Sequence, residues 1–284
     1  METFIAAAFI GVIIGVFSGL LGIGGGTLMV PIFRLGFGMS AIASTATSLF
    51  TIIPTSLGGF ITHIRNKTCI PKVGLVCGLA GACTSPLGVY LASVSPSWSI
   101  MLAAALIIGY SSFTMFRKAI RMPKIPSQGA SAVVGVDRER AVEQAASKAA
   151  SEEAPFAFTP KKMGMCICIG LVAGLASGYV GVGGGFIMVP MFISLLGIMM
   201  RQASGTSLVA VTILAIPGVI EQGMLGNINY TAGIAMAIGS IPGAILGANL
   251  TRRVPERKLR FVFGAFLLLS AVVLLLNEFL PLFL

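Results

Sequence analysis

Long apolar stretches without a charged residue are the feature that most constrains the fold of this chain. Four of them extend over Phe4 to Leu21, Val73 to Ala92, Thr231 to Leu250 and Phe261 to Leu276. A helix needs about 20 mostly apolar residues to cross a bilayer, and the mean hydropathy of +0.98 lies well outside the range of soluble domains. We therefore expect an all-α integral membrane protein.

The chain also contains two copies of one unit. The segment GVIIGVFSGLLGIGGGTLMVPIF, which begins at Gly11, returns as GLVAGLASGYVGVGGGFIMVPMF, which begins at Gly170, with 12 of 23 positions identical. The same offset of 159 residues continues beyond the segment, since Thr47-Ser48-Leu49 corresponds to Thr206-Ser207-Leu208. This regularity indicates an internal duplication.

A polar segment separates the two copies. It matches neither of them and is rich in Ala, Glu, Lys, Arg, Ser and Gln, a composition typical of a solvated linker. We predict a first repeat over residues 1–117, a hydrophilic linker over 118–162 and a second repeat over 163–284. Residues 137–153 could form a surface helix within the linker.

The distribution of basic residues predicts the topology. With four crossings per repeat the copies are parallel, and the 19 basic residues divide 12 to 7 between the two faces. With five membrane segments per repeat, four full helices plus one short half-helix, the repeats are inverted and Arg34 alone lies on the outer face. The positive-inside rule favours the second arrangement, with the linker in the cytoplasm and both termini outside.

Consecutive glycines predict a break in one helix of each repeat. The apolar pieces that follow, Thr27–Gly38 and Phe186–Ile198, have about 12 residues, or about 18 Å of helix, and cannot cross the bilayer alone. A half-helix that starts at membrane depth points unpaired amides and its positive dipole end toward the break, which favours an anion there. The glycines at Gly11, Gly15 and Gly19 instead indicate close helix packing.

Hydroxyl groups recur beside both breaks and could donate to a bound oxyanion, although such groups also bond to carbonyls of their own helix. The predicted substrate-binding residues are Gly24, Gly25, Gly26, Thr27, Thr47, Ser48, Gly183, Gly184, Gly185, Phe186, Thr206 and Ser207.

Three ionisable residues lie near segment ends, and none of them is duplicated. Glu221 and His63 are candidates for proton coupling, and Arg34 is a candidate attractor of anions in the outer vestibule. The alternative for each is an interfacial position in contact with water. Five cysteines and one histidine lack metal-ligand spacing, so we expect no cofactor, no metal and no catalytic set. The basic residues lie at helix ends and in the linker, which does not indicate nucleic-acid binding.

The paired motifs GIGGGTLMVP and GVGGGFIMVP, each followed by Thr-Ser-Leu, with a hydrophilic central loop, resemble those of the TauE/SafE family of sulfite and organosulfonate exporters. The resemblance covers nearly the whole chain outside the linker. It implies a multi-pass transporter of the cytoplasmic membrane for a small sulfur oxyanion, such as sulfite or a sulfonate like sulfoacetate. The resemblance implies that the glycine clusters form the substrate site together with Thr47, Ser48, Thr206 and Ser207.

Several alternatives stay open from the sequence. An anion channel would share the breaks but differ in turnover, and a membrane scaffold subunit would use them for packing alone. The sequence leaves open the transported anion, the direction of flux, coupling to protons and the formation of a homodimer.

Overall fold

The computed structural model describes residues 2–121 and 159–279, and every regular element in these ranges is helical. The first half contains α1 (Glu2–Leu21), α2 (Gly26–Gly36), α3 (Ala41–Arg65), α4 (Pro71–Val94) and α5 (Ser97–Arg121). The second half contains α7 (Pro160–Val180), α8 (Gly185–Met191), the π-helical turn η1 (Phe192–Leu196), α9 (Met200–Met224), α10 (Tyr230–Leu250) and α11 (Glu256–Phe279). Seven helices of the described ranges are long and apolar enough to cross a membrane. The prediction of an all-α multi-pass membrane protein is confirmed.

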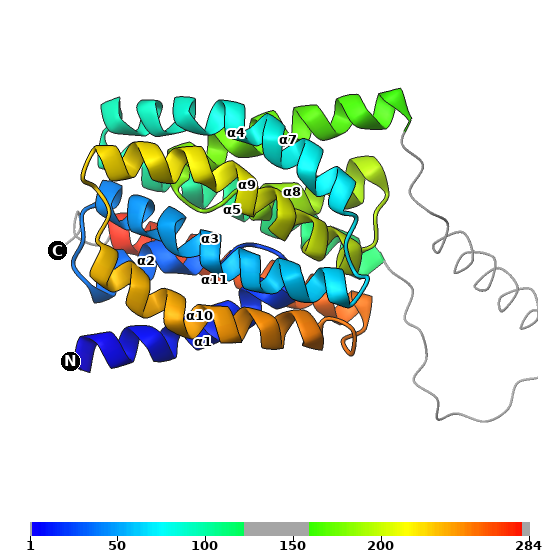
Figure 1. The fold of residues 1–284 in the computed structure, drawn as a ribbon, viewed down its shortest axis with the longest axis horizontal. Helices are drawn as coiled ribbons and strands as arrows, with labels where there is room; N and C mark the ends of the chain where they lie inside the picture. The colour runs from blue at the N-terminus through cyan, green and yellow to red at the C-terminus, as the bar shows by residue number, and fades with distance from the viewer. Residues whose placement is uncertain (1, 122–158, 280–284) are drawn as a thin grey trace, which may run out of the picture.

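The helices of the two halves follow the same order and run in opposite directions. In Figure 1, α3 runs from the left end of the molecule to the right, whereas α9 runs from right to left. Helix α1 begins and α11 ends at the left, while α5 ends and α7 begins at the right. This is the arrangement that an inverted repeat requires, and descent from one duplicated unit remains an interpretation of the sequence register.

The predicted linker lies largely outside the described residues. These exclude residues 122–158, and with them the candidate surface helix over 137–153. Helix α5 extends to Arg121 and α7 begins at Pro160, so both helices continue into the edges of the segment predicted as linker. One reason is that Lys118 folds back onto the second half, where its ammonium donates a hydrogen bond of 3.3 Å to the carbonyl oxygen of Pro190.

Short helices follow both glycine segments, as predicted. Helix α2 has 11 residues, and α8 has 7 residues before it continues into η1. At 1.5 Å per residue α2 is about 16 Å long, about half the hydrocarbon core of a bilayer. Because α3 starts at the left of Figure 1, shortly after α2 ends, α2 turns back from the break toward the end of the molecule at which α1 begins.

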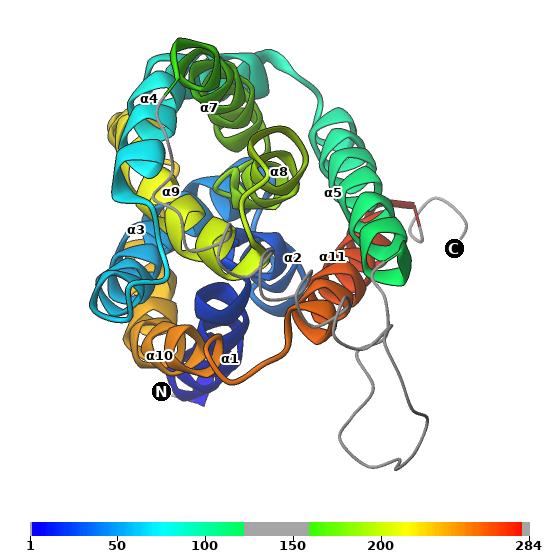
Figure 2. The same ribbon diagram turned by 90° about the vertical axis from the view of Figure 1, so that its right-hand side faces the viewer.

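Two helix pairs pack along ladders of small residues and join the halves. Helix α1 lies along α10, and α4 lies along α7 (Figure 2). A Cβ atom at Gly15 would lie 2.2 Å from the carbonyl oxygen of Ser240, and a Cβ atom at Gly174 would lie 2.1 Å from that of Gly81. The two contacts correspond under the offset of 159 residues. The packing interpretation of the first glycine ladder is confirmed, and the two halves are interleaved.

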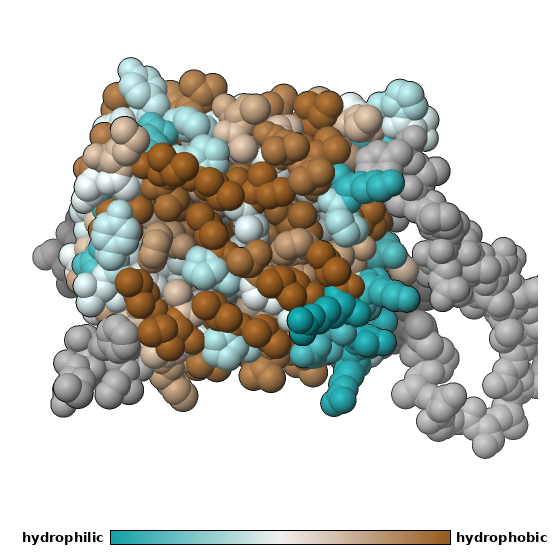
Figure 3. Space-filling view, viewed as in Figure 1, coloured by the Kyte–Doolittle hydropathy of each residue, from teal (hydrophilic) through white to brown (hydrophobic). Residues whose placement is uncertain are grey.

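The surface separates into an apolar band and a basic end. Apolar side chains cover the helices in Figure 3, and hydrophilic residues gather at the end where α5 stops and α7 starts. The exposed basic residues in and beside the loops of that end include Arg65, Lys67, Lys72, Arg252, Arg253 and Lys258. Arg34 lies near the other end, in the last turn of α2. Such a band between a basic and a less charged end suits a protein that spans a bilayer.

Substitution of Gly15 by alanine should destabilise the protein by about 3 kcal/mol, because the added methyl group overlaps the backbone of α10. The matched control is Gly109→Ala in α5, where a Cβ atom meets nothing within 4 Å. That change should be neutral or stabilising by up to about 1 kcal/mol, from helix propensity. Thermal unfolding in detergent measures both, and equal midpoints for the two variants would contradict the packing described here.

Candidate functional site

Each glycine segment is a left-handed backbone turn between two helices. In the first segment φ is +75° at Gly22, +83° at Gly24 and +87° at Gly25. The corresponding residues of the second segment have values of +74°, +84° and +69°. Side chains with a Cβ atom adopt this region at a cost, whereas glycine adopts it freely. The repeated glycines therefore reverse the chain twice in the interior of the molecule, at positions related by the sequence register.

The two segments meet at the centre of the protein. A Cβ atom at Gly26 would lie 2.6 Å from the carbonyl oxygen of Val182, and a Cβ atom at Gly185 would lie 2.6 Å from that of Gly22. Every residue from Leu21 to Thr27 is buried, as is every residue from Gly181 to Pro190. The two breaks therefore lie against one another in the structure, shielded from the surroundings.

The helices of the opposite half enclose each segment. A Cβ atom at Gly22 would lie 2.4 Å from Cα of Ser204 in α9, and one at Gly181 would lie 2.6 Å from Cα of Thr45 in α3. Ser204 and Thr45 correspond to one another in the register. The first break therefore lies against the second half and the second break against the first half, which makes the site a joint product of both.

Several backbone amides at the breaks have no backbone hydrogen-bond partner among the described residues. Among the described residues, the amides of Gly24, Gly25 and Gly26 donate no hydrogen bond to another backbone group, and neither do those of Gly183 and Gly184. Unpaired amides and the positive end of the dipole of α2 give the site a partial positive charge without a charged side chain. Such groups can bind an anion by hydrogen bonds.

Buried hydroxyl groups without partners accompany the amides. The hydroxyl oxygens of Thr27 in the first turn of α2, Ser18 in α1 and Ser177 in α7 have no hydrogen-bond partner among the described residues. Ser18 and Ser177 correspond in the register, and Cβ of Ser18 would lie 3.5 Å from a Cβ atom at Gly25. An unpaired buried hydroxyl costs free energy, so such a group beside unpaired amides indicates a place for a polar ligand.

Ser48 and Ser207 lie in the predicted region but differ in their contacts. The hydroxyl of Ser207 lies 2.6 Å from the carbonyl oxygen of Gly22 and 2.8 Å from that of Ser204. The hydroxyl of Ser48 is buried and has no partner among the described residues. The two halves are therefore not equivalent at this point, although their sequences match.

Thr47 and Thr206 point to loops of the opposite half. The amide of Asn229 donates to Oγ1 of Thr47 at 3.0 Å, and the amide of Ile70 donates to Oγ1 of Thr206 at 2.9 Å. Each threonine thus accepts the amide of the residue that precedes α10 or α4. This paired structural role accounts for their recurrence in the sequence, and their role in substrate binding stays a prediction.

An apolar pair fills the space between the breaks, and the sequence analysis did not single it out. A Cβ atom at Gly24 would lie 2.9 Å from Cγ1 of Val211 and 3.2 Å from Cγ2 of Ile52. A Cβ atom at Gly183 would lie 3.0 Å from Cδ1 of Ile52 and 3.3 Å from Cγ1 of Val211. Ile52 and Val211 are separated by 159 residues, so the register contained the signal that could have identified them.

The three ionisable candidates lie near the ends of their helices. His63 is buried near the end of α3, where Nε2 lies 2.9 Å from the carbonyl oxygen of Gly19 and Nδ1 lies 2.7 Å from Oγ1 of Thr68. Glu221 lines a cavity of about 390 Å³ with Pro86 and Pro217 near the end of α9. Arg34 lies in the last turn of α2, away from the break where that helix begins. Their predicted roles in coupling and attraction stay predictions.

Known proteins resemble this chain over almost its full length. A family model described as sulfite exporter TauE/SafE matches residues 7–274. The probable membrane transporter protein YunE of Bacillus subtilis is 24% identical over 274 residues, which cover 94% of this chain and 95% of that protein. The probable membrane transporter protein MJ0441 of Methanocaldococcus jannaschii is 24% identical over 281 residues, with 94% and 93% covered. No solved structure matches the chain significantly.

Replacement of Thr206 by valine should lower the free energy of unfolding by about 1–3 kcal/mol, because the amide of Ile70 loses its acceptor in a partly buried loop. Thr212→Val is the matched control in the same helix, since that hydroxyl donates only to the carbonyl oxygen of Leu208 one turn away. Thermal unfolding of the purified proteins compares the two. A control as unstable as Thr206→Val would remove the loop contact as the cause.

Proposed function

The chain belongs to the TauE/SafE sulfite exporter family, and we propose that it is a secondary transporter that exports a small sulfur-containing anion, such as sulfite or a sulfonate. Its relatives of similar length carry the description of probable membrane transporters. The observation that supports the substrate class is the pair of facing glycine breaks with unpaired amides and buried, unpartnered hydroxyls.

The chemistry of the proposed site suits a small oxyanion. A sulfite or sulfonate group has three oxygen acceptors, and the first break offers amides from Gly24 to Gly26 together with the hydroxyl of Thr27. Hydrogen bonds from neutral donors hold an anion in an apolar interior less tightly than a salt bridge with arginine would. This suits a transporter, which has to release its substrate on the far side.

We infer that transport proceeds by alternating access, with one half moving against the other around the paired breaks. The unequal contacts of Ser207 and Ser48 support this mechanism. In an inverted repeat the two halves exchange conformations between the two open states, so a contact made by Ser207 with Gly22 in one state becomes a contact of Ser48 with Gly181 in the other. The buried, unpartnered Ser48 hydroxyl is the counterpart that such an exchange requires.

Substitution of Thr27 by valine tests the site directly. The change keeps the shape of the side chain and removes a hydroxyl that has no protein partner, so stability should stay the same or rise slightly. Loss of one hydrogen bond to an anion should raise the substrate concentration for half-maximal flux about tenfold. The measurement is uptake of radiolabelled sulfite and sulfoacetate by proteoliposomes, over a range of concentrations.

Thr212→Val serves again as the control and should transport as the parent does. Saturable flux in the parent with unchanged half-saturation in Thr27→Val would remove Thr27 from the site. Flux that stays proportional to concentration, at channel rates, would favour an anion channel. Absence of flux for every sulfur oxyanion would overturn the substrate class and favour the scaffold alternative.

The proposed orientation places the basic end of Figure 3 and the linker in the cytoplasm, with both chain termini outside. In a variant whose five native cysteines are replaced by alanine, single cysteines are introduced by Glu2→Cys, Phe283→Cys and Ser147→Cys. A membrane-impermeant maleimide added to intact cells should label the first two and leave the third unlabelled until the cells are opened. Labelling of the linker cysteine in intact cells would reverse the orientation.

A further inference from the structure

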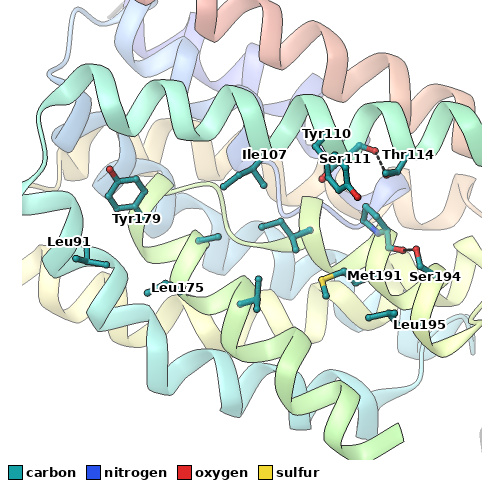
Figure 4. A pocket seen from close by; sticks show the side chains of 14 residues that line it. Leu91, Ile107, Tyr110, Ser111, Thr114, Leu175, Tyr179, Met191, Ser194 and Leu195 are labelled. Atoms are coloured by element: carbon teal, nitrogen blue, oxygen red, sulfur yellow. Dashed lines mark hydrogen bonds between the residues drawn. The ribbon is translucent and has the colours of Figure 1, made fainter.

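A deep groove opens on the side of the molecule between α5 and the helices α7 and α8. It encloses about 680 Å³, within the range of ligand-binding pockets. Figure 4 shows side chains from α4, α5, α7, α8 and η1 around it, among them Ile107, Tyr179 and Met191. The groove is separate from the glycine breaks.

The groove lies between the two halves, since α5 belongs to the first half and α7 and α8 belong to the second. The equivalent position between α1 and α11 contains Phe17 and Phe266, whose ring centroids are 5.1 Å apart. Under the offset of 159 residues their counterparts are Ala176 of α7 and Ile107 of α5, and both line the groove. Smaller side chains therefore border the groove where two aromatic rings occupy the equivalent position.

The walls of the groove are mostly apolar and face the bilayer. The aliphatic side chains of Leu91 and Leu195 at its margins are 44% and 49% exposed, and Tyr110 is 71% exposed. These residues belong to segments that lie within the apolar band of a membrane-spanning protein. A groove of this kind is open to lipid tails, and a hydrocarbon chain would supply contacts like those that Phe17 and Phe266 make at the equivalent position.

One end of the groove carries a positive charge. The ammonium group of Lys118 donates to the carbonyl oxygen of Pro190 at 3.3 Å and contacts the hydroxyl of Ser194, and both residues line the groove. An ammonium has three donors, so one remains for a further acceptor. Lys118 lies in the last turn of α5, at the basic end of the molecule, where Figure 3 shows hydrophilic side chains. In a chain that spans a bilayer, this end of α5 would lie near the phosphate groups of the lipids.

We propose that this groove binds one anionic phospholipid, with an acyl chain between α5 and α7 and its phosphate at Lys118. The small side chains of Ala176 and Ile107 leave space for the acyl chain. The third N–H donor of the Lys118 ammonium gives the preference for a negatively charged headgroup. The bound lipid contacts Pro190 and Met191, which belong to the half-helix that starts at the second glycine break.

The test compares lipid retention by native mass spectrometry, with dioleoyl phosphatidylglycerol or dioleoyl phosphatidylcholine added to the purified full-length protein. The parent should retain one phosphatidylglycerol per chain under activation that removes other lipids. The variant Ile107→Phe, Ala176→Phe introduces at the groove the two aromatic residues that occupy the equivalent position between α1 and α11, and this filled variant should retain at least about tenfold less. Leu106→Phe, at an exposed neighbouring position of α5 outside the groove, is the matched control and should bind as the parent does.

A second variant keeps the test independent of the folding of the first. Lys118→Gln leaves the shape of the groove intact and should retain the two lipids equally, whereas the parent prefers phosphatidylglycerol. Undiminished retention in the filled variant, or an unchanged preference in Lys118→Gln, would overturn the proposal. Loss of a dimer in the filled variant with lipid retention unchanged would assign the groove to a second copy of the chain instead.

Discussion

An unpaired backbone amide at membrane depth costs several kcal/mol, and two runs of glycine amides at the centre of the described structure have no backbone partner. The surrounding helices keep these amides away from lipid. Helices α3 and α9 enclose the glycine turns from opposite sides, and the short helices α2 and α8 direct their first amides toward the same place. The small residues along α1 and α4 bring further helices close enough to exclude lipid from this interior. The arrangement is stable because protein, and not hydrocarbon, borders the exposed backbone.

Interleaving of the two halves follows from the same ladders. Gly15 of the first half lies against Ser240 of the second, and Gly174 of the second lies against Gly81 of the first. Neither half has a complete partner for its own first helix, so each repeat completes its packing only with the other. The boundaries at residues 117 and 163 stay a prediction from the sequence, and the interleaved packing indicates that the two halves are not compact bodies that fold apart.

The sequence was sufficient for the helices and the breaks, because apolar length and consecutive glycines act through backbone physics that needs no side-chain detail. The sequence did not predict which groups the side chains around the breaks contact. Thr47 and Thr206 recur as faithfully as the glycines, yet their oxygens accept loop amides of Asn229 and Ile70. A residue that is repeated in both halves is under a shared constraint. Repetition alone does not show whether its role is to bind a ligand or to hold a loop. Ile52 and Val211 are also related by the offset of 159 residues. Their side chains have no polar atom, so the sequence offered no reason to place them at the centre of the site.

That aliphatic pair has a consequence for electrical leakage. Ile52 and Val211 border both turns, so branched hydrocarbon side chains lie beside the polar groups of the breaks. A constriction of branched hydrocarbon side chains excludes water, and a dry constriction is a barrier to protons and small cations alike. We therefore expect the idle protein to limit leakage of these ions across a membrane.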